Sequence, residues 1–123
     1  MTFSDVLERM TSRIQGGSAA MILGVDGIPI ERYIADGQNS DLDIEMISTE
    51  LTTLLRRSMK TAADTALGQL NEMLLTTDRM TFLLRPITTD YFLILAILPG
   101  GNVGRGRFEL RKAQLSLMEE FVL

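Results

Sequence analysis

The sequence predicts an α+β fold in which a single five-stranded antiparallel sheet is flanked by helices, in the order α-β-β-α-β-β-β-α. Three observations lead to this prediction. Apolar residues recur at helical spacing in three stretches, five short apolar runs are typical of strands, and turn residues separate those runs. The length of 123 residues and the 46% share of apolar residues fit one globular domain spanning residues 1–123.

The N-terminal segment predicts an amphipathic helix. Ser4 is a candidate N-cap, and Gly16-Gly17 ends the pattern. One face of this helix gathers its apolar side chains, which are Phe3, Val6, Leu7, Met10 and Ile14.

A β-hairpin is expected next. Strand Ala19–Val25 leads into the Asp26-Gly27 turn, where both residues are expected to adopt positive φ, and strand Ile28–Ala35 returns. Because Pro29 has no N–H to donate, this second strand is expected at the sheet edge.

A long helix is predicted from Asp41 to about Ala66. Ser40, Asp41 and Asp43 suit its N-terminus, and Gly68 marks its end. The predicted core stripe of this helix consists of Ile44, Ile47, Leu51, Leu54, Leu55, Met59, Ala62 and Ala66.

Three strands and a helix complete the chain. The strands are expected over Glu72–Thr76, Met80–Arg85 and Tyr91–Leu98, and the last is apolar throughout, which places it at the sheet centre. The closing helix is expected over Arg105–Phe121, and its predicted buried side consists of Phe108, Leu115, Met118 and Val122.

The composition excludes several functions. The chain has no histidine and no cysteine, so it lacks Ser-His and Cys-His nucleophilic pairs, thiolate chemistry and His-ligated metal sites. A calcium-loop template is met by Asn39, Asp41, Asp43 and Glu50, but Ile44 stands where glycine is required, so neither a metal nor a cofactor is expected. A pI of about 4.8 argues against nucleic-acid binding. No run reaches membrane-span length and the N-terminus lacks an apolar signal core, which predicts a cytoplasmic protein.

The glycine-rich loop after the most apolar strand matches a phosphate-binding loop only in part. Gly101 and Gly106 have the P-loop spacing, but Arg107 and Phe108 stand where lysine and a hydroxyl residue are required. A plain strand-to-helix connection is therefore expected.

Basic residues crowd the start of the closing helix, although the first 50 residues carry nine acids against three arginines. Either they pair with Asp5 and Glu8 on a neighbouring helix or they form a surface for an acidic partner. The basic residues are Arg105, Arg107, Arg111 and Lys112.

The long helix has two features of an interaction surface. The small residues Ser58, Thr61 and Thr65 flank its core stripe and would let another helix approach closely. Its opposite face is lightly charged for a face that meets only solvent, and it consists of Met46, Thr49, Thr53, Arg57, Lys60 and Asp64. If the following strand, Glu72–Thr76, is an edge, it invites pairing with a copy of itself. An ordinary helix over an interior strand remains equally compatible with the pattern.

Four segments taken in order resemble the roadblock/LC7 family, and the likeness is to its bacterial, MglB-type members. The segments are GVDGIPI (Gly24–Ile30), ALGQLNEMLLTTD (Ala66–Asp78), LRPITTDYFLILAILP (Leu84–Pro99) and GNVGRGRFELRKA (Gly101–Ala113). The resemblance covers essentially the whole chain and follows the same order of elements.

The resemblance implies a homodimer that regulates a Ras-like small GTPase and is not itself an enzyme. In this family the long helix and the strand after it join two five-stranded sheets into one of ten strands. Carried onto this chain, the dimer contact would use Leu54, Ser58, Thr61, Thr65, Met73 and Leu75. The GTPase would dock across the paired long helices, on Met46, Thr49, Thr53, Arg57 and Lys60.

Several alternatives stay open at the level of sequence. Some activators of this type carry an extension after the last helix and this sequence stops at Leu123, so the chain either activates GTP hydrolysis or only binds the GTPase. It either pairs with itself or with a paralogue. A structural adaptor without effect on nucleotide turnover is the alternative function, and a small-molecule sensor domain is a third. An arginine finger from Arg105 or Arg107 is a further hypothesis.

Overall fold

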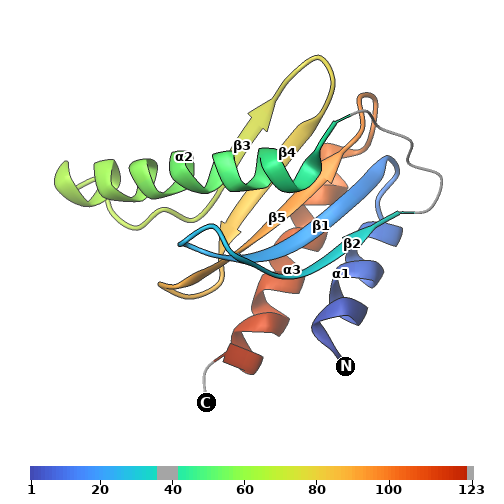
Figure 1. Cartoon of the computed structure of the whole chain (residues 1–123), viewed down its shortest axis with the longest axis horizontal. Coiled ribbons are helices and arrows are strands. Elements are labelled where there is room, and N and C mark those ends of the chain that lie inside the picture. Colours follow the sequence, from blue (N-terminus) through green and yellow to red (C-terminus); the bar gives the residue numbers. More distant parts are fainter. Residues whose placement is uncertain (36–41, 122–123) are drawn as a thin grey trace.

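The computed structural model describes residues 1–35 and 42–121, which contain the expected elements in the expected order (Figure 1). The helices are α1 (Phe3–Ser12), α2 (Ile44–Asp64) and α3 (Val103–Phe121). The strands are β1 (Gly17–Gly24), β2 (Pro29–Ile34), β3 (Met73–Thr76), β4 (Thr81–Pro86) and β5 (Tyr91–Ile97). The predictions for Asn39, Ser40, Asp41 and Val122 lie outside the described residues.

The strands form one sheet in the spatial order β2-β1-β5-β4-β3, and every neighbouring pair is antiparallel. The apolar β5 lies at the centre, as predicted. Pro29 begins β2, and β2 lies at one edge, where a strand residue without an N–H is tolerated. The β1–β2 ladder is also irregular between Ile22 and Leu23. The opposite edge is β3.

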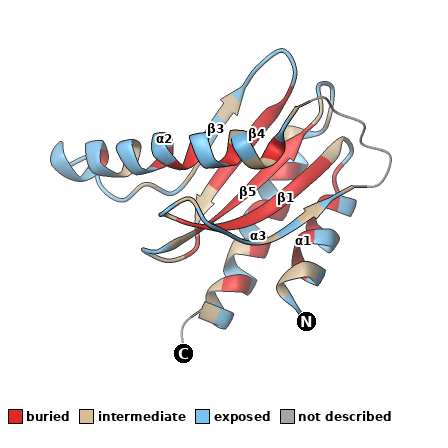
Figure 2. Cartoon of the chain, viewed as in Figure 1, coloured by how far each residue is buried: buried red, intermediate tan, exposed pale blue. Residues whose placement is uncertain are grey.

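Helices cover both faces of the sheet, with α1 and α3 on one face and α2 on the other (Figure 1). Alternate residues of β5 enter the two layers: Leu93 and Leu95 pack with α1 and α3, whereas Phe92 and Ile94 pack with α2. Figure 2 shows the buried residues concentrated along the inner strands. No helix within residues 1–35 and 42–121 is long and apolar enough to cross a bilayer.

The N-cap of α1 is Thr2, so the prediction of Ser4 is wrong. Thr2 Oγ1 accepts a hydrogen bond from the Asp5 N–H (3.1 Å), and Asp5 Oδ2 accepts one from the Thr2 N–H (3.1 Å). These reciprocal bonds form a capping box, which Ser4 lies too far along the helix to make. The bond from the Thr2 backbone lowers the pKa of the Asp5 carboxyl, because it stabilises the charged form.

The β1–β2 turn differs from the prediction at Asp26. Gly27 has a positive φ of 90°, whereas Asp26 does not. The Gly27 N–H bonds to Gly24 O and the Gly24 N–H to Ile28 O, both at 2.9 Å, which makes a three-residue loop with a single left-handed glycine. Asp26 Oδ1 accepts a hydrogen bond from the Ile28 N–H (3.0 Å), so this residue acts through its side chain.

The predicted core stripe of α2 is wrong at two residues. Leu54 is 41% exposed, and Ala66 lies beyond the end of the helix, exposed and with a φ of 56°. Ser48 and Thr52, which are outside the predicted stripe, are buried as well. Thr52 Oγ1 donates to the Ser48 carbonyl oxygen one turn earlier (2.9 Å), so its hydroxyl is satisfied within the helix.

The predicted buried side of α3 is wrong at Phe108 and Leu115, which are 59% and 55% exposed. Met118, which was also predicted to be buried, is partly buried. The side that faces the sheet consists of Gly106, Glu109, Leu110, Ala113 and Leu117. Gly106 has no side chain to separate the helix from β4 and β5, and turning this residue inward turns Phe108 outward.

Candidate functional site

Helix α2 is anchored on the sheet by one side and leaves the rest of its surface free. Asp43 Oδ1 accepts a hydrogen bond from the Met46 N–H (3.0 Å) and so caps the helix. Leu51 and Leu55 pack into the core layer between α2 and the sheet. Figure 1 shows the C-terminal part of α2 extending past the strands.

The four predicted dimer residues of α2 lie along one flank of the helix. Leu54, Thr61 and Thr65 are exposed, and Ser58 is half-buried. Ser58 Oγ donates to Leu54 O (2.9 Å), and Thr65 Oγ1 donates to Thr61 O (2.7 Å). Because these two hydroxyls are already satisfied by the backbone, a second helix can cover them without leaving a donor unpaired.

Strand β3 places the other two predicted dimer residues below α2. The Met73 and Leu75 side chains are half-buried against the α2-side core, and Leu74 points to the opposite face and is 52% exposed. Leu74 is absent from the predicted site residues, since alternation along a strand does not reveal which of its two faces is covered. Glu45, on the other side of α2, pairs with Arg32 of β2, so the flank of α2 faces the β3 edge of the sheet.

The outer edge of β3 carries unpaired backbone groups. Within the described part of the chain β3 pairs with β4 alone. The Thr77 N–H bonds to Met80 O (3.0 Å), and in an antiparallel ladder bonded pairs alternate, so Leu74 and Thr76 direct their N–H and C=O groups outward. Such an edge is a template for another strand.

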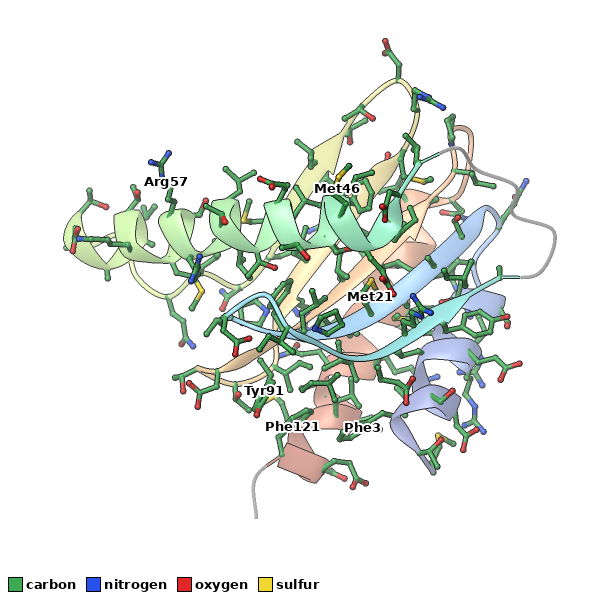
Figure 3. All side chains as sticks on the ribbon, viewed as in Figure 1. Phe3, Met21, Met46, Arg57, Tyr91 and Phe121 are labelled. Atoms are coloured by element: carbon green, nitrogen blue, oxygen red, sulfur yellow. The ribbon has the colours of Figure 1, made fainter. Side chains whose placement is uncertain are left out.

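The five residues predicted to face a GTPase are all exposed on the outward side of α2. Met46 is 59% exposed, and Figure 3 shows Arg57 projecting from the helix away from the sheet. Thr49 Oγ1 donates to Glu45 O (3.0 Å). Lys60 Nζ lies 2.6 Å from Asp64 Oδ2, but both groups are well exposed, so the pair leaves Lys60 available to a partner. Thr53 lies at the middle of this surface.

The glycine loop before α3 is a packed joint. The Asn102 N–H bonds to Gln15 O (2.9 Å), and the Gly101 N–H bonds to Leu98 O (3.0 Å). A Cβ on Gly101 would lie 2.7 Å from Gln15 O, so the glycine allows this close approach. Asn102 Oδ1 then caps α3 by accepting from the Arg105 N–H (2.9 Å). These N–H groups therefore donate to backbone oxygens of the same chain and are not free for a phosphate, as in a plain strand-to-helix connection.

The basic residues at the start of α3 do not pair with Asp5 or Glu8. Arg107 Nε lies 2.6 Å from Glu72 Oε1, and Arg105 Nη2 lies 2.9 Å from Glu109 Oε1, although that contact is not aligned as a hydrogen bond. The expectation of local pairing with α1 is therefore wrong for these two arginines. Both lie on α3, on the opposite side of the sheet from α2.

The arrangement is suited to binding. The exposed flank of α2, its outward side and the β3 edge adjoin one another, and together they present small and apolar side chains with unpaired backbone groups. Among the described residues no three acidic side chains gather as a metal site would require.

Comparison with known proteins gives structural matches alone, because no family model and no curated protein matches this sequence. The roadblock/LC7 domain from Streptomyces avermitilis is 10% identical and matches 100% of both chains with a TM-score of 0.85. MglC from Myxococcus xanthus is 29% identical over 98% of this chain and 99% of that chain, with a TM-score of 0.70.

The chain has the roadblock/LC7 fold. The resemblance inferred from its sequence segments is thereby confirmed, as is the α+β fold with its element order. The chain also has the fold of MglB, described as a gliding protein, from Thermus thermophilus. That structure is 16% identical and matches over 94% of this chain and 84% of that chain, with a TM-score of 0.82.

Proposed function

We propose that this roadblock/LC7 domain is a homodimer that binds and regulates a Ras-like small GTPase. The observation that carries the proposal is the open edge of β3 beside the small-residue flank of α2, with a free, lightly charged helix surface directly above it. The likeness to MglC over nearly the whole chain supports it, as does the fold shared with an MglB that adopts a tetrameric arrangement.

In the proposed dimer, β3 of one protomer pairs with β3 of its partner and the two α2 helices pack by their flanks. Leu54, Ser58, Thr61 and Thr65 supply the helix contact, and Met73 and Leu75 lie at the strand contact. The β3–β3 ladder pairs the outward backbone groups of Leu74 and Thr76. Dimerisation also brings the two outward α2 surfaces together, which gives a GTPase a larger surface than either protomer presents alone.

Sedimentation of the purified protein tests the dimer. The wild-type chain is expected to sediment as a dimer, and Thr61→Arg is expected to give a monomer, because a long cation on the flank prevents close approach of two helices. Thr89→Arg adds the same charge in the exposed β4–β5 turn and should leave the dimer intact. A monomeric wild-type chain, or a dimeric Thr61→Arg variant, would contradict this part of the proposal.

The GTPase contact is tested with the Ras-like small GTPase encoded in the same genome. We expect the domain to bind the GTP form in preference to the GDP form and to change the rate of GTP hydrolysis. Thr53→Arg, at the middle of the outward side of α2, should weaken the complex by about tenfold or more while leaving the dimer intact. No complex with either form would defeat the proposed regulation.

A structural adaptor is the second candidate function. It is favoured by the position of Arg105 and Arg107, which are engaged by carboxylates on the sheet face away from α2 and therefore do not approach a GTPase docked there. Equal affinity for the GTP and GDP forms, with no change in hydrolysis, would identify the adaptor. The same titration thus separates the two candidates.

A further inference from the structure

A second exposed surface lies on the other side of the sheet, where α1 and α3 pack side by side. Phe108 and Leu115 project outward from α3, and both are more than half exposed. They stand seven residues apart, which places them on one side of the helix about two turns from each other. Arg111 and Lys112 lie between them and are also exposed.

Positive charge surrounds these two apolar residues. Arg105 lies one turn before them on α3, and Arg9 and Arg13 project from α1 beside Lys112. We call this surface, made of Phe108, Arg111, Lys112 and Leu115 with those three arginines, the basic face. No ion pair joins Arg111 or Lys112 to another residue in the described part of the chain.

Acidic residues also border the basic face, but they are fewer than its cations: Asp5 and Glu8 lie beside Arg9, and Glu119 stands one turn after Leu115. Glu109 lies among the cations, but its side chain is only 2% exposed and is flanked by Arg13 (3.9 Å) and Arg105 (2.9 Å). Glu119 and Glu120 lie beyond Leu115, so positive charge is confined to the N-terminal part of α3. The chain as a whole carries a net charge of −4, and the basic face is therefore opposite in sign to the rest of the molecule.

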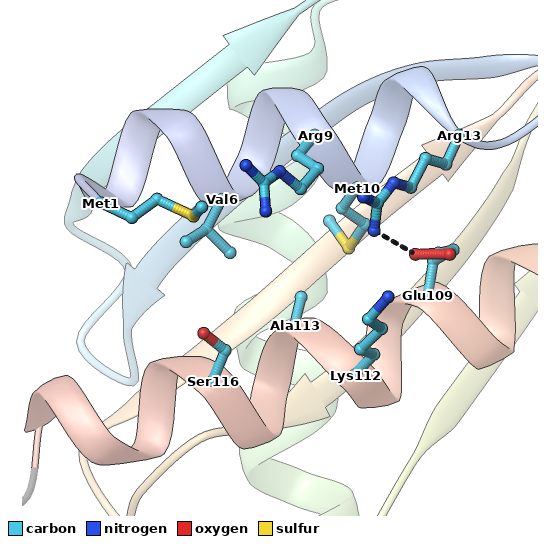
Figure 4. Close-up of a pocket in the computed structure, with 9 residues that line it drawn as sticks. All are labelled: Met1, Val6, Arg9, Met10, Arg13, Glu109, Lys112, Ala113 and Ser116. Carbon is cyan, nitrogen blue, oxygen red and sulfur yellow. Dashed lines mark ion pairs between the residues drawn. The ribbon is translucent and has the colours of Figure 1, made fainter.

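A cavity of about 150 Å³ opens between α1 and α3 at the border of the basic face (Figure 4). Its apolar lining comes from Met1, Val6, Met10 and Ala113, and its cations are Arg9, Arg13 and Lys112. Ser116 and the buried Glu109 complete the lining. An apolar cavity of roughly this size accepts a benzene molecule, so this one has room for an apolar side chain.

We propose that the basic face docks an acidic amphipathic helix of a partner protein. An apolar side chain of that helix enters the cavity between α1 and α3, others contact Phe108 and Leu115, and its carboxylates pair with Arg111 and Lys112. The spacing of Phe108 and Leu115 matches apolar positions that recur every seven residues on a helix. An acidic helix is complementary to the basic face, whereas an extended anionic membrane would also meet the net negative charge of the chain.

This inference goes beyond the proposed GTPase contact, because the basic face and the outward side of α2 lie on opposite sides of the sheet. Both can be occupied at the same time. A domain with these two surfaces can hold a GTPase on one side while an acidic partner fixes the position of the assembly on the other.

The test uses the full chain and a synthetic fourteen-residue peptide as a probe. The peptide has leucine at the first, fourth, eighth and eleventh positions, which share one side of the helix that it forms when bound, and mostly glutamate elsewhere. NMR titration should shift the amide resonances of Met10, Phe108, Arg111, Lys112 and Leu115. A scrambled peptide of equal composition, and a version with lysine in place of glutamate, should bind about tenfold more weakly or worse.

Matched variants separate the basic face from general charge effects. Arg111→Glu should weaken peptide binding about tenfold, whereas Arg56→Glu, the same change at an exposed arginine of α2, should alter it less than about twofold. Phe108→Ser should also weaken binding, and because this side chain is exposed the variant should unfold like the wild type.

Four results would overturn the proposal. The first is equal peptide binding by Arg111→Glu and the wild type, and the second is binding of the scrambled peptide as tightly as the designed one. The third is binding to vesicles of equal parts phosphatidylcholine and phosphatidylserine without binding to the peptide, which would assign the basic face to a membrane. A change of oligomeric state in Arg111→Glu alone would likewise contradict it, because the basic face would then join copies of this chain.

Discussion

Gly106 lies where α3 crosses the sheet, and Gly106→Ala measures how closely the helix must approach β4 and β5. A Cβ at this position would lie 2.5 Å from Ile97 Cδ1 and 3.3 Å from Leu83 Cδ1. Both neighbours are fully buried, with no free space in which to retreat. Since carbon atoms in contact prefer a separation of about 3.5–4.0 Å, either the Ile97 side chain changes rotamer or the helix moves outward.

The magnitude follows from a comparison with Gly104→Ala. Gly104 belongs to the same first turn of α3, but a Cβ there would meet only Asn102 Oδ1, at 3.6 Å. Each alanine gains up to about 1 kcal/mol of helix propensity, whereas overpacking at Gly106 costs about 1–3 kcal/mol. The propensity gain is shared, so the free energy of unfolding of Gly106→Ala should be lower than that of Gly104→Ala by about 1–3 kcal/mol.

Urea unfolding of the two variants at one protein concentration measures this difference. The concentration must be held constant, because association between copies raises the apparent stability. The same difference corresponds to about 4 °C in Tm for each kcal/mol. Equal stability of the two variants, or a more stable Gly106→Ala, would refute the view that the missing side chain of Gly106 sets the distance between α3 and the sheet.

Two further predictions concern charged groups. Glu72→Gln removes the carboxylate that bonds Arg85 (2.9 Å) and Arg107 (2.6 Å). It should lower the free energy of unfolding by about 1–3 kcal/mol, because the largely buried Arg85 loses its charged partner and keeps the bond from its Nε to Gln114 Oε1 (2.7 Å). Arg107→Gln should cost about 1 kcal/mol or less in the same urea titration, since Arg107 is exposed, and equal losses would contradict this. The folded-state pKa of Asp5 lies below its ordinary value of 3.8. The bonds between Asp5 and Thr2 therefore stabilise the fold fully above the unfolded-state pKa. This stabilisation is lost as pH falls through the folded-state pKa. The free energy of unfolding of Asp5→Asn should therefore fall less at acid pH than that of the wild type. An equal fall in both proteins would count against the capping box.

The order of elements was predictable because each signal is local. Pro29 lacks an N–H, which by itself places β2 at an edge, and the uninterrupted apolar run of β5 requires cover on both faces. The rotation of α3 was not predictable in this way. It depends on Gly106 meeting side chains of β4 and β5, and on Glu109 being buried beside Arg13, a residue that precedes β1. Such partners are distant in sequence.

The candidate site also has features that local sequence signals predict and features that depend on residues distant in the sequence. Helical spacing alone separates the flank of α2 from its outward side. Both sets of residues lie on the surface, with Ser58 half-buried, but Leu54 is exposed although the spacing assigned it to the core stripe. The exposed Leu74 could not be found, because alternation along β3 yields two faces and the sequence does not reveal that Met73 and Leu75 lie under α2. The roles of both sets of residues stay predictions.

The two edges of the sheet differ in a way that limits assembly. At β2, Pro29 and the irregular ladder interrupt the strand, and an ion pair between Arg32 and Glu45 ties it to α2. At β3, the backbone is regular and open. In the proposed dimer the β3 strands of the two copies pair with each other, and the joined sheet has a β2 strand at each of its two edges. In that dimer, strand pairing would stop at a closed pair and would not continue as a polymer, because the two edges of the sheet are unequal.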